Sequence, residues 1–151
     1  MAIDSAAIVE AARAWIGTPY VHQASMKGIG CDCLGLLRGV WREVVGPEPE
    51  AMQPYSPDWA DATGEETLYA VLKRHLDEIA LAALAPGDIA LFRIVPHGPA
   101  KHCGIIGCAT ASLLERGGPL TLIHTRQNKR VNEELFSPLW RRKLAFAFRL
   151  G

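Results

Sequence analysis

The chain has 151 residues, and 49% of them are hydrophobic, which is enough to build the core of one compact domain over residues 1–151. Its 16 basic side chains balance 16 acidic ones, so no broad charge favours nucleic acid or an anionic membrane as a partner. Neither a signal peptide nor a membrane-spanning stretch is predicted. We therefore expect cytoplasmic synthesis and four reduced cysteines rather than a disulfide framework.

The first half of the sequence has the periodicity of helices. Asp4 or Ser5 can cap a first helix that ends at 17–19, and a glycine-rich loop follows over 21–30. A second helix begins at or next to Cys33, with Asp32 well placed as its N-cap, and it ends at 46–47. The segment 47–57 carries four prolines, which indicates an extended connector. Helical spacing returns over 64–79.

After residues 86–87 the pattern becomes typical of strands. Strands are predicted over 88–94, 102–108 and 120–125, and a last strand over 144–150 places its large side chains on one face. The segment 140–143 leads into that last strand. Because the helices precede the strands rather than alternate with them, we expect an α+β fold with helices packed on one side of a small antiparallel β-sheet.

Cys33 is the strongest candidate for a catalytic nucleophile. A cysteine at a helix N-terminus meets unsatisfied backbone N–H groups and the positive end of the helix dipole, which favour the thiolate. His102, on a predicted strand, would take the thiol proton and later protonate a leaving amine. His124, on the next strand, would accept a hydrogen bond from the other ring nitrogen and orient the ring. The three residues predict a papain-like site for covalent acyl transfer.

Other residues are candidates for binding substrate or the oxyanion. The backbone N–H of Cys33, and the hydroxyl of Tyr20, would stabilise an oxyanion, although Tyr20 could instead be a packing residue. His22 either lines the cleft and binds substrate or only contacts solvent. Asp32 lies next to the same cleft, where a role as helix cap and loop brace is favoured over a role as an acid.

A metal site is an alternative use of the cysteines. Cys31 and Cys33 could supply ligands together with others from the set His102, Cys103 and Cys108. However, the Cys31–Cys33 spacing is not that of structural zinc sites, and two adjacent strand residues point to opposite faces. We therefore expect no metal and no cofactor, with Cys103 and Cys108 packed in or near the sheet.

Several short motifs follow one another along the chain: Gly17-Thr18-Pro19-Tyr20, Asp32-Cys33-Leu34-Gly35-Leu36, Pro86-Gly87-Asp88, His102-Cys103-Gly104-Ile105 and Ile123-His124. In this order they resemble the motifs of the NlpC/p60 family of bacterial and phage cell-wall cysteine peptidases, over most of the chain. The resemblance implies a papain-like NlpC fold and hydrolysis of peptidoglycan stem peptides, at a D-γ-glutamyl–diaminopimelate bond.

Two segments resemble the phage-tail and gene-transfer-agent branch of that family, namely Trp41-Arg42-Glu43 and Trp140-Arg141-Arg142-Lys143. This resemblance implies that a tail-like particle delivers the domain to the cell wall. The chain departs from most members at His22-Gln23, where they have Trp-Gly-Gly, and at Leu34, where they have Ser. The first departure changes a wall of the cleft.

Other functions stay open beside the peptidase. One is a structural tail-tip component that keeps the fold without turnover, and another is a cell-wall amidase. An acyltransferase on a related, permuted fold is disfavoured, because the cysteine precedes the histidine in this sequence.

Overall fold

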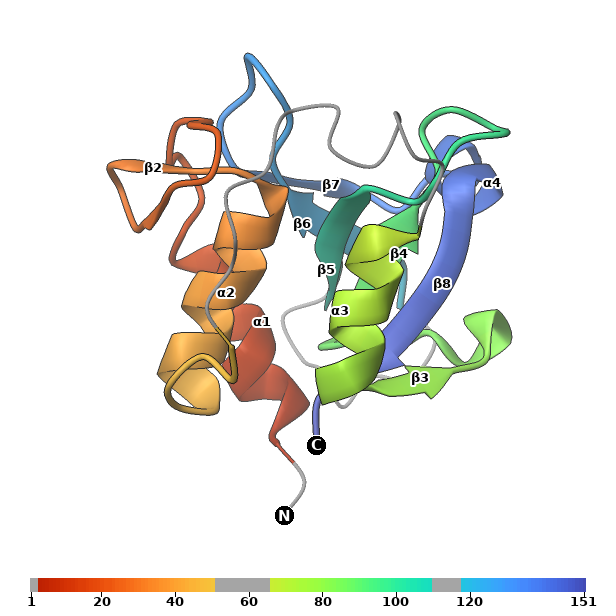
Figure 1. Cartoon of the computed structure of the whole chain (residues 1–151), viewed down its shortest axis with the longest axis horizontal. Coiled ribbons are helices and arrows are strands. Elements are labelled where there is room, and N and C mark those ends of the chain that lie inside the picture. Colours follow the sequence, from red (N-terminus) through yellow and green to blue (C-terminus); the bar gives the residue numbers. More distant parts are fainter. Residues whose placement is uncertain (1–2, 51–65, 110–117) are drawn as a thin grey trace.

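The computed structural model describes residues 3–50, 66–109 and 118–151. In chain order its elements are α1 (Ser5–Arg13), β1 (Ser25–Met26), β2 (Gly30–Cys31), α2 (Cys33–Val44), α3 (Thr67–His75), β3 (Asp77–Ile79), the 3-10 helix η1 (Leu81–Ala83), β4 (Ile89–Phe92), β5 (His102–Cys108), β6 (Leu120–His124), β7 (Asn132–Leu135), α4 (Pro138–Lys143) and β8 (Leu144–Arg149). In Figure 1, α3 stands in front of the sheet and α2 stands to the left of β5, and the β1–β2 hairpin lies near the first turn of α2.

The central sheet has the strand order β3-β8-β4-β5-β6-β7, and every neighbouring pair is antiparallel. One face carries Leu91, Cys103 and Ile123, which share a buried core with residues of α1, α2 and α3. The opposite face carries Phe92 and Leu122, which form a second core with Trp140 of α4. This arrangement confirms the predicted α+β class, with α1, α2 and α3 on one side of the sheet, whereas α4 lies on the other side.

Helices α1 and α2 begin at the residues that the sequence indicates. The Asp4 carboxylate caps α1 by accepting from the backbone N–H of Ala6, at 3.0 Å. Asp32 caps α2 in the same way. Trp15, just after α1, packs against α2 at Gly39, where an added Cβ would lie 2.0 Å from Cζ2 of the Trp15 ring. Helix α2 also contacts β5, and this contact sets its first turn near the start of that strand.

Two predicted helices are shorter than expected. Helix α1 ends at Arg13, and the buried Trp15 follows it in a turn, where its backbone N–H donates to the carbonyl oxygen of Ala12. Helix α3 ends at His75, and Asp77–Ile79 forms strand β3 rather than a helical turn. Pairing with β8 at the sheet edge overrides the local helical spacing there. The predicted residues 64–65 and most of the connector, 51–57, lie outside the described residues.

Two elements near the C-terminus were not predicted. Strand β7 contains no buried residue, so it lacks the alternation that reveals a strand. Helix α4 occupies the segment expected to lead into the last strand, and Ser137 caps it. The predicted single face for the large residues of the last strand holds for Phe146, Phe148 and Leu150, which belong to the core beneath the helices, and fails for Leu144. The register shifts between Leu91 and Phe92, so Leu144 packs on the α4 side.

Candidate active site

Cys33 is the first residue of α2, as predicted. Asp32 Oδ1 accepts a hydrogen bond from the backbone N–H of Gly35 at 2.7 Å, which closes the first turn behind the sulfur. The Cys33 side chain is partly exposed. Its sulfur lies 3.9 Å from the carbonyl oxygen of Lys101, immediately before β5. The thiol is therefore placed between the positive end of a helix dipole and the beginning of a central strand.

Two neighbours on β5 favour the ionised form of this thiol. A hydrogen bond from the Cys103 thiol holds the pKa of Cys33 well below its usual value. Burial opposes this shift, whereas a hydrogen bond and the positive charge of His102 add to it. The same contact with Cys33, together with burial, raises the pKa of Cys103, which stays a protonated donor. The Cys103 sulfur also lies 3.4 Å from the carbonyl oxygen of Cys33. These contacts favour the thiolate of Cys33 over its thiol.

The two histidines of the prediction meet directly. His102 Nε2 lies 2.9 Å from His124 Nδ1, so the ring nitrogen of His102 that remains for Cys33 is Nδ1. His102 is 7% exposed and His124 is fully buried. Burial and the nearby charge of His102 lower the pKa of His124 from 6.5 to about 4, although Glu134 opposes this shift. His124 is therefore neutral at neutral pH.

The backbone at Gly104 leaves room for this pair. Gly104 lies two residues from His102 on the same face of β5. An added Cβ there would lie 2.6 Å from Leu122 Cδ1 and 3.1 Å from His124 Cβ. A glycine at this position therefore allows β6 to bring His124 against His102.

Two further residues, Glu134 and Trp140, extend the site, and neither role is predicted from the sequence. Glu134 Oε2 lies 2.7 Å from His124 Nε2, and Glu134 Oε1 accepts from Trp140 Nε1–H at 2.9 Å. Burial opposes the ionisation of Glu134, but hydrogen bonds from His124 and Trp140 lower its pKa below the usual value. No local signal marks Glu134, because only the pairing of β6 with β7 brings it to His124.

Aromatic rings cover the histidines on the α4 side. The Trp140 ring stacks on His102 with centroids 5.6 Å apart and meets His124 edge-on at 5.0 Å. Phe92 lies 5.8 Å from His102 and 5.1 Å from Trp140, again between centroids. Such rings exclude water from a hydrogen bond between imidazoles, which strengthens it.

The loop that carries Tyr20 and His22 lies against Cys31 and the first turn of α2. Tyr20 forms a bridge with Cys31, and burial, followed by the charges of Cys33 and Asp32, raises the pKa of Tyr20 to about 12. Its hydroxyl is therefore a donor at neutral pH. His22 Nδ1 lies 3.9 Å from Asp32 Oδ2, which also accepts from the backbone N–H of Gln23 at 2.8 Å. Asp32 thus has the predicted place of cap and loop brace, while the substrate roles of the three stay predictions.

Cys31 and Cys108 do not belong to any group of potential metal ligands among the described residues. Cys31 is buried, and burial followed by the charges of Asp32 and Cys33 raises its pKa to about 12. Cys108 is buried at the far end of β5. Over residues 3–50, 66–109 and 118–151, no three histidines, cysteines or carboxylates gather as metal ligands. None of the described helices is long and apolar enough to span a membrane.

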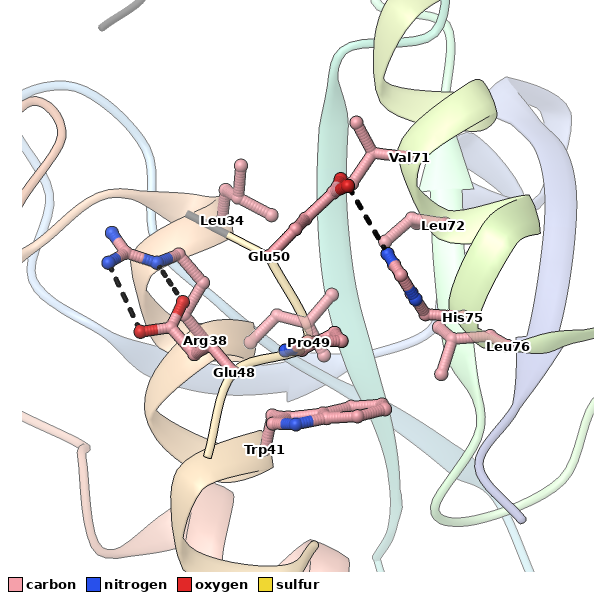
Figure 2. Close-up of a pocket in the computed structure, with 11 residues that line it drawn as sticks. Leu34, Arg38, Trp41, Glu48, Pro49, Glu50, Val71, Leu72, His75 and Leu76 are labelled. Atoms are coloured by element: carbon pink, nitrogen blue, oxygen red, sulfur yellow. Dashed lines mark hydrogen bonds and ion pairs between the residues drawn. The ribbon is translucent and has the colours of Figure 1, made fainter. Parts of the chain in front are cut away.

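A separate apolar pocket lies between α2, the segment 48–50 and α3 (Figure 2). Among its polar side chains, Arg38 Nε lies 2.6 Å from Glu48 Oε1, and His75 Nε2 lies 3.6 Å from Glu50 Oε2. None of the three predicted catalytic side chains lines it. The candidate site at the N-terminal end of α2 therefore lies outside this pocket.

Comparison with solved structures identifies the fold. The NlpC/p60 domain of the peptidoglycan hydrolase SagA is 23% identical, with a TM-score of 0.65, and the match covers 98% of this chain and 100% of that one. An NlpC/p60 family protein from Bacillus cereus ATCC 10987 is 16% identical over 99% of this chain and 41% of its own, with a TM-score of 0.65. An NLP/P60 family protein from Staphylococcus aureus, described as similar to lipoprotein, is 18% identical over 99% and 43%, with a TM-score of 0.59. The chain has the fold of NlpC/p60 domains.

Comparison of sequences gives a different kind of match. No protein-family model matches the chain. One curated protein, a homoserine O-succinyltransferase from Methylorubrum extorquens, is 30% identical over 111 residues. The match covers 67% of this chain and 28% of that protein, so the chain spans little more than a quarter of the length of this relative.

Proposed function

We propose that this protein is a cysteine peptidase that hydrolyses peptidoglycan stem peptides. The observation that carries the proposal is the Cys33–His102–His124 arrangement, with the imidazoles 2.9 Å apart and Cys33 at a helix N-terminus. The fold supports the substrate class, because the NlpC/p60 domain that matches over its full length belongs to a peptidoglycan hydrolase.

In the proposed reaction Cys33 is the nucleophile, and His102 carries out both proton transfers. The Cys33 thiolate attacks the carbonyl carbon of the scissile amide, and the resulting oxyanion accepts hydrogen bonds from the Cys33 backbone N–H and the Tyr20 hydroxyl. The His102 imidazolium gives its Nδ1 proton to the amine as the C–N bond breaks. Water then attacks the acyl-cysteine and passes a proton to His102, which releases the acid and restores the thiolate.

We propose further that the scissile bond joins D-γ-glutamate to diaminopimelate, and that a phage-tail-like particle delivers the domain to the cell wall. Both statements are supported by the sequence motifs alone. The segment His22-Gln23 lies beside Tyr20 and would form the cleft wall that selects the stem. The competing functions are a structural tail-tip component without turnover and an amidase that cuts at the sugar-linked L-alanine.

A second candidate is acyl transfer, which the name of the curated relative suggests. An acyl-cysteine can be resolved by a hydroxyl or amine acceptor instead of water. Incubation with succinyl-CoA and homoserine, followed by product analysis, tests this directly. Succinylhomoserine formed at a rate above that of stem-peptide cleavage would replace the peptidase proposal.

The test of the peptidase proposal is digestion of defined substrates, read by mass spectrometry of the new amino termini. A D-γ-glutamyl–diaminopimelate tetrapeptide and a cross-linked muropeptide should be cut, and casein should remain intact. Cys33→Ala should abolish cleavage, while Cys31→Ser, which changes a buried thiol two residues away, should retain most of it. A cut at the L-alanine would support the amidase, and no cleavage of any substrate would support the structural component.

A further inference from the structure

We propose that Glu134 is a positioning residue that sets the tautomers of His124 and His102, so that His102 presents an unprotonated Nδ1 to the thiol of Cys33. This inference rests on the proposed function, because it concerns the proton transfers of the same site. It follows from a continuous chain of hydrogen bonds that runs from Trp140 through Glu134 and both histidines.

The position of Glu134 depends on the register of β6 and β7. Glu134 lies opposite Leu122, two residues away from His124 on the same face of the sheet. Diagonal neighbours of this kind come within reach of long side chains. Glu134 spans the gap and places Oε2 2.7 Å from His124 Nε2, while Trp140 Nε1 lies 2.9 Å from Oε1.

Trp140, at one end of this series of hydrogen bonds, determines the direction of every bond in it. The indole N–H of Trp140 can only donate, and an ionised carboxylate can only accept. Glu134 therefore accepts from Trp140 and from His124, which places the single proton of neutral His124 on Nε2. The bare Nδ1 of His124 then accepts from His102 Nε2–H across 2.9 Å. A neutral His102 consequently has its lone pair on Nδ1, which is the nitrogen left for Cys33.

The same arrangement suits the charged state of the pair. When His102 takes the thiol proton, its Nε2–H keeps donating to His124, so no hydrogen bond in the chain has to reverse. The carboxylate of Glu134 lies one imidazole away from the new positive charge and favours it. Glu134 thus stabilises the thiolate–imidazolium pair without touching the substrate.

A glutamine at this position cannot do the same. Its side chain has the shape of glutamate but only one oxygen, whereas Trp140 and His124 both donate toward residue 134. If the amide NH₂ faces His124, the ring must move its proton to Nδ1, and His102 must then carry its own proton on Nδ1. That tautomer of His102 cannot accept the proton of Cys33.

The experiment compares Glu134→Gln and Glu134→Asp with Glu133→Gln as a matched control on the same strand. Glu133 points to the other face, where Oε2 accepts from Arg13 at 2.8 Å and from Thr121 at 2.6 Å. We expect Glu134→Gln to lower kcat about 10- to 100-fold with little change in KM, by analogy with carboxylates that orient a metal-bound imidazole. Glu134→Asp, which keeps the charge, should recover part of the loss, and Glu133→Gln should keep wild-type kcat.

Two measurements need no peptide substrate and separate this inference from the proposed function. Nitrogen-15 NMR of the wild-type imidazoles should show His124 protonated at Nε2 and bare at Nδ1. The rate of Cys33 alkylation by iodoacetamide near neutral pH should fall in Glu134→Gln and not in Glu133→Gln.

Different results would overturn the role of Glu134 and the peptidase function. A wild-type His124 that carries its proton on Nδ1, or a folded Glu134→Gln with wild-type alkylation and kcat, would overturn the role of Glu134. A wild-type protein that cuts no stem peptide but shows the expected NMR and alkylation would overturn the peptidase and leave the tautomer assignment standing.

Discussion

Cys103 shows how a residue expected to be structural contributes to the candidate site. The sequence predicts that Cys103 packs in or near the sheet, and that His102 and Cys103 face opposite sides of β5. They do pack on opposite faces, since Cys103 belongs to the core beneath the helices and His102 contacts Trp140. Both nevertheless reach Cys33, because that residue lies at the start of the strand, where Lys101 also approaches its sulfur.

A prediction at this scale concerns the acidity of Cys33. Cys103→Ala removes the thiol that hydrogen-bonds to the Cys33 sulfur, which is the largest influence lowering the pKa of Cys33. We therefore expect the pH midpoint for iodoacetamide alkylation of Cys33 to rise. Cys108→Ala, a buried cysteine at the far end of the same strand, is the control and should leave the midpoint unchanged. Identical midpoints in both variants would show that Cys103 does not act on the thiolate.

We expect the two histidines to differ in how much kcat falls when each is replaced by alanine. His102→Ala removes the base itself, so we expect a loss of about 100- to 10,000-fold in kcat. His124→Ala removes the orienting partner and should cost less, because His102 still reaches Cys33. Steady-state kinetics on a stem peptide measure both. If His22→Ala were inactive while His102→Ala was not, the base would have to be reassigned to the loop beside Tyr20.

At the scale of elements, the first turn of α2 depends on its contact with the loop before it. The carbonyl of Gly35 accepts from the Ser25 hydroxyl at 2.6 Å, and Gly35 N–H donates to Asp32. An added Cβ at Gly35 would lie 1.9 Å from the backbone oxygen of Ala24. Because a backbone atom cannot rotate away like a side chain, this loop and the helix can only stay together if residue 35 is glycine.

Gly35→Ala should therefore lower the free energy of unfolding by about 1–3 kcal/mol, as overpacking does. It should also raise KM, since the displaced loop carries Tyr20 and His22. Gly98→Ala is the control, because its added Cβ would come no closer to another residue than 3.3 Å, the distance to Val95 Cβ, and would meet no severe overlap. Urea unfolding measures the stability of both variants. An unchanged midpoint for Gly35→Ala would mean that the loop accommodates a methyl group.

For the whole molecule, the buried His124 links folding to pH. Its pKa is lowered from 6.5 to about 4 by burial and by the charge of His102. Between these values the unfolded chain binds a proton that the folded protein does not, so stability is complete above pH 6.5 and falls as the pH drops toward 4. From pH 7 to pH 5 the loss amounts to about 2 kcal/mol.

The variant His124→Gln, which has no titrating ring, isolates this contribution. Urea unfolding of wild type and variant at several pH values should show curves that converge as the pH falls from 7 to 5. Parallel curves would show that His124 titrates in the folded protein as it does in the unfolded chain. Carboxylates such as Glu133, held by Arg13, affect both proteins alike and cancel in the difference.

The sequence by itself determined the features that depend on local chemistry. Asp4 and Asp32 cap the helices because their carboxylates bond backbone N–H groups two or three residues away, so Cys33 could be placed at the first position of α2. The strand-like apolar segments 102–108 and 120–125 predicted β5 and β6, and therefore placed both histidines on neighbouring strands.

Only the tertiary structure decided which distant groups complete the site. Strand β7 carries no buried side chain, yet its pairing with β6 brings Glu134 to His124. Helix α4 folds back so that Trp140 covers both histidines, a contact between residues 16 or more positions apart. Such contacts leave no periodic pattern in the sequence, because their free energy comes from packing between elements rather than from neighbours along the chain.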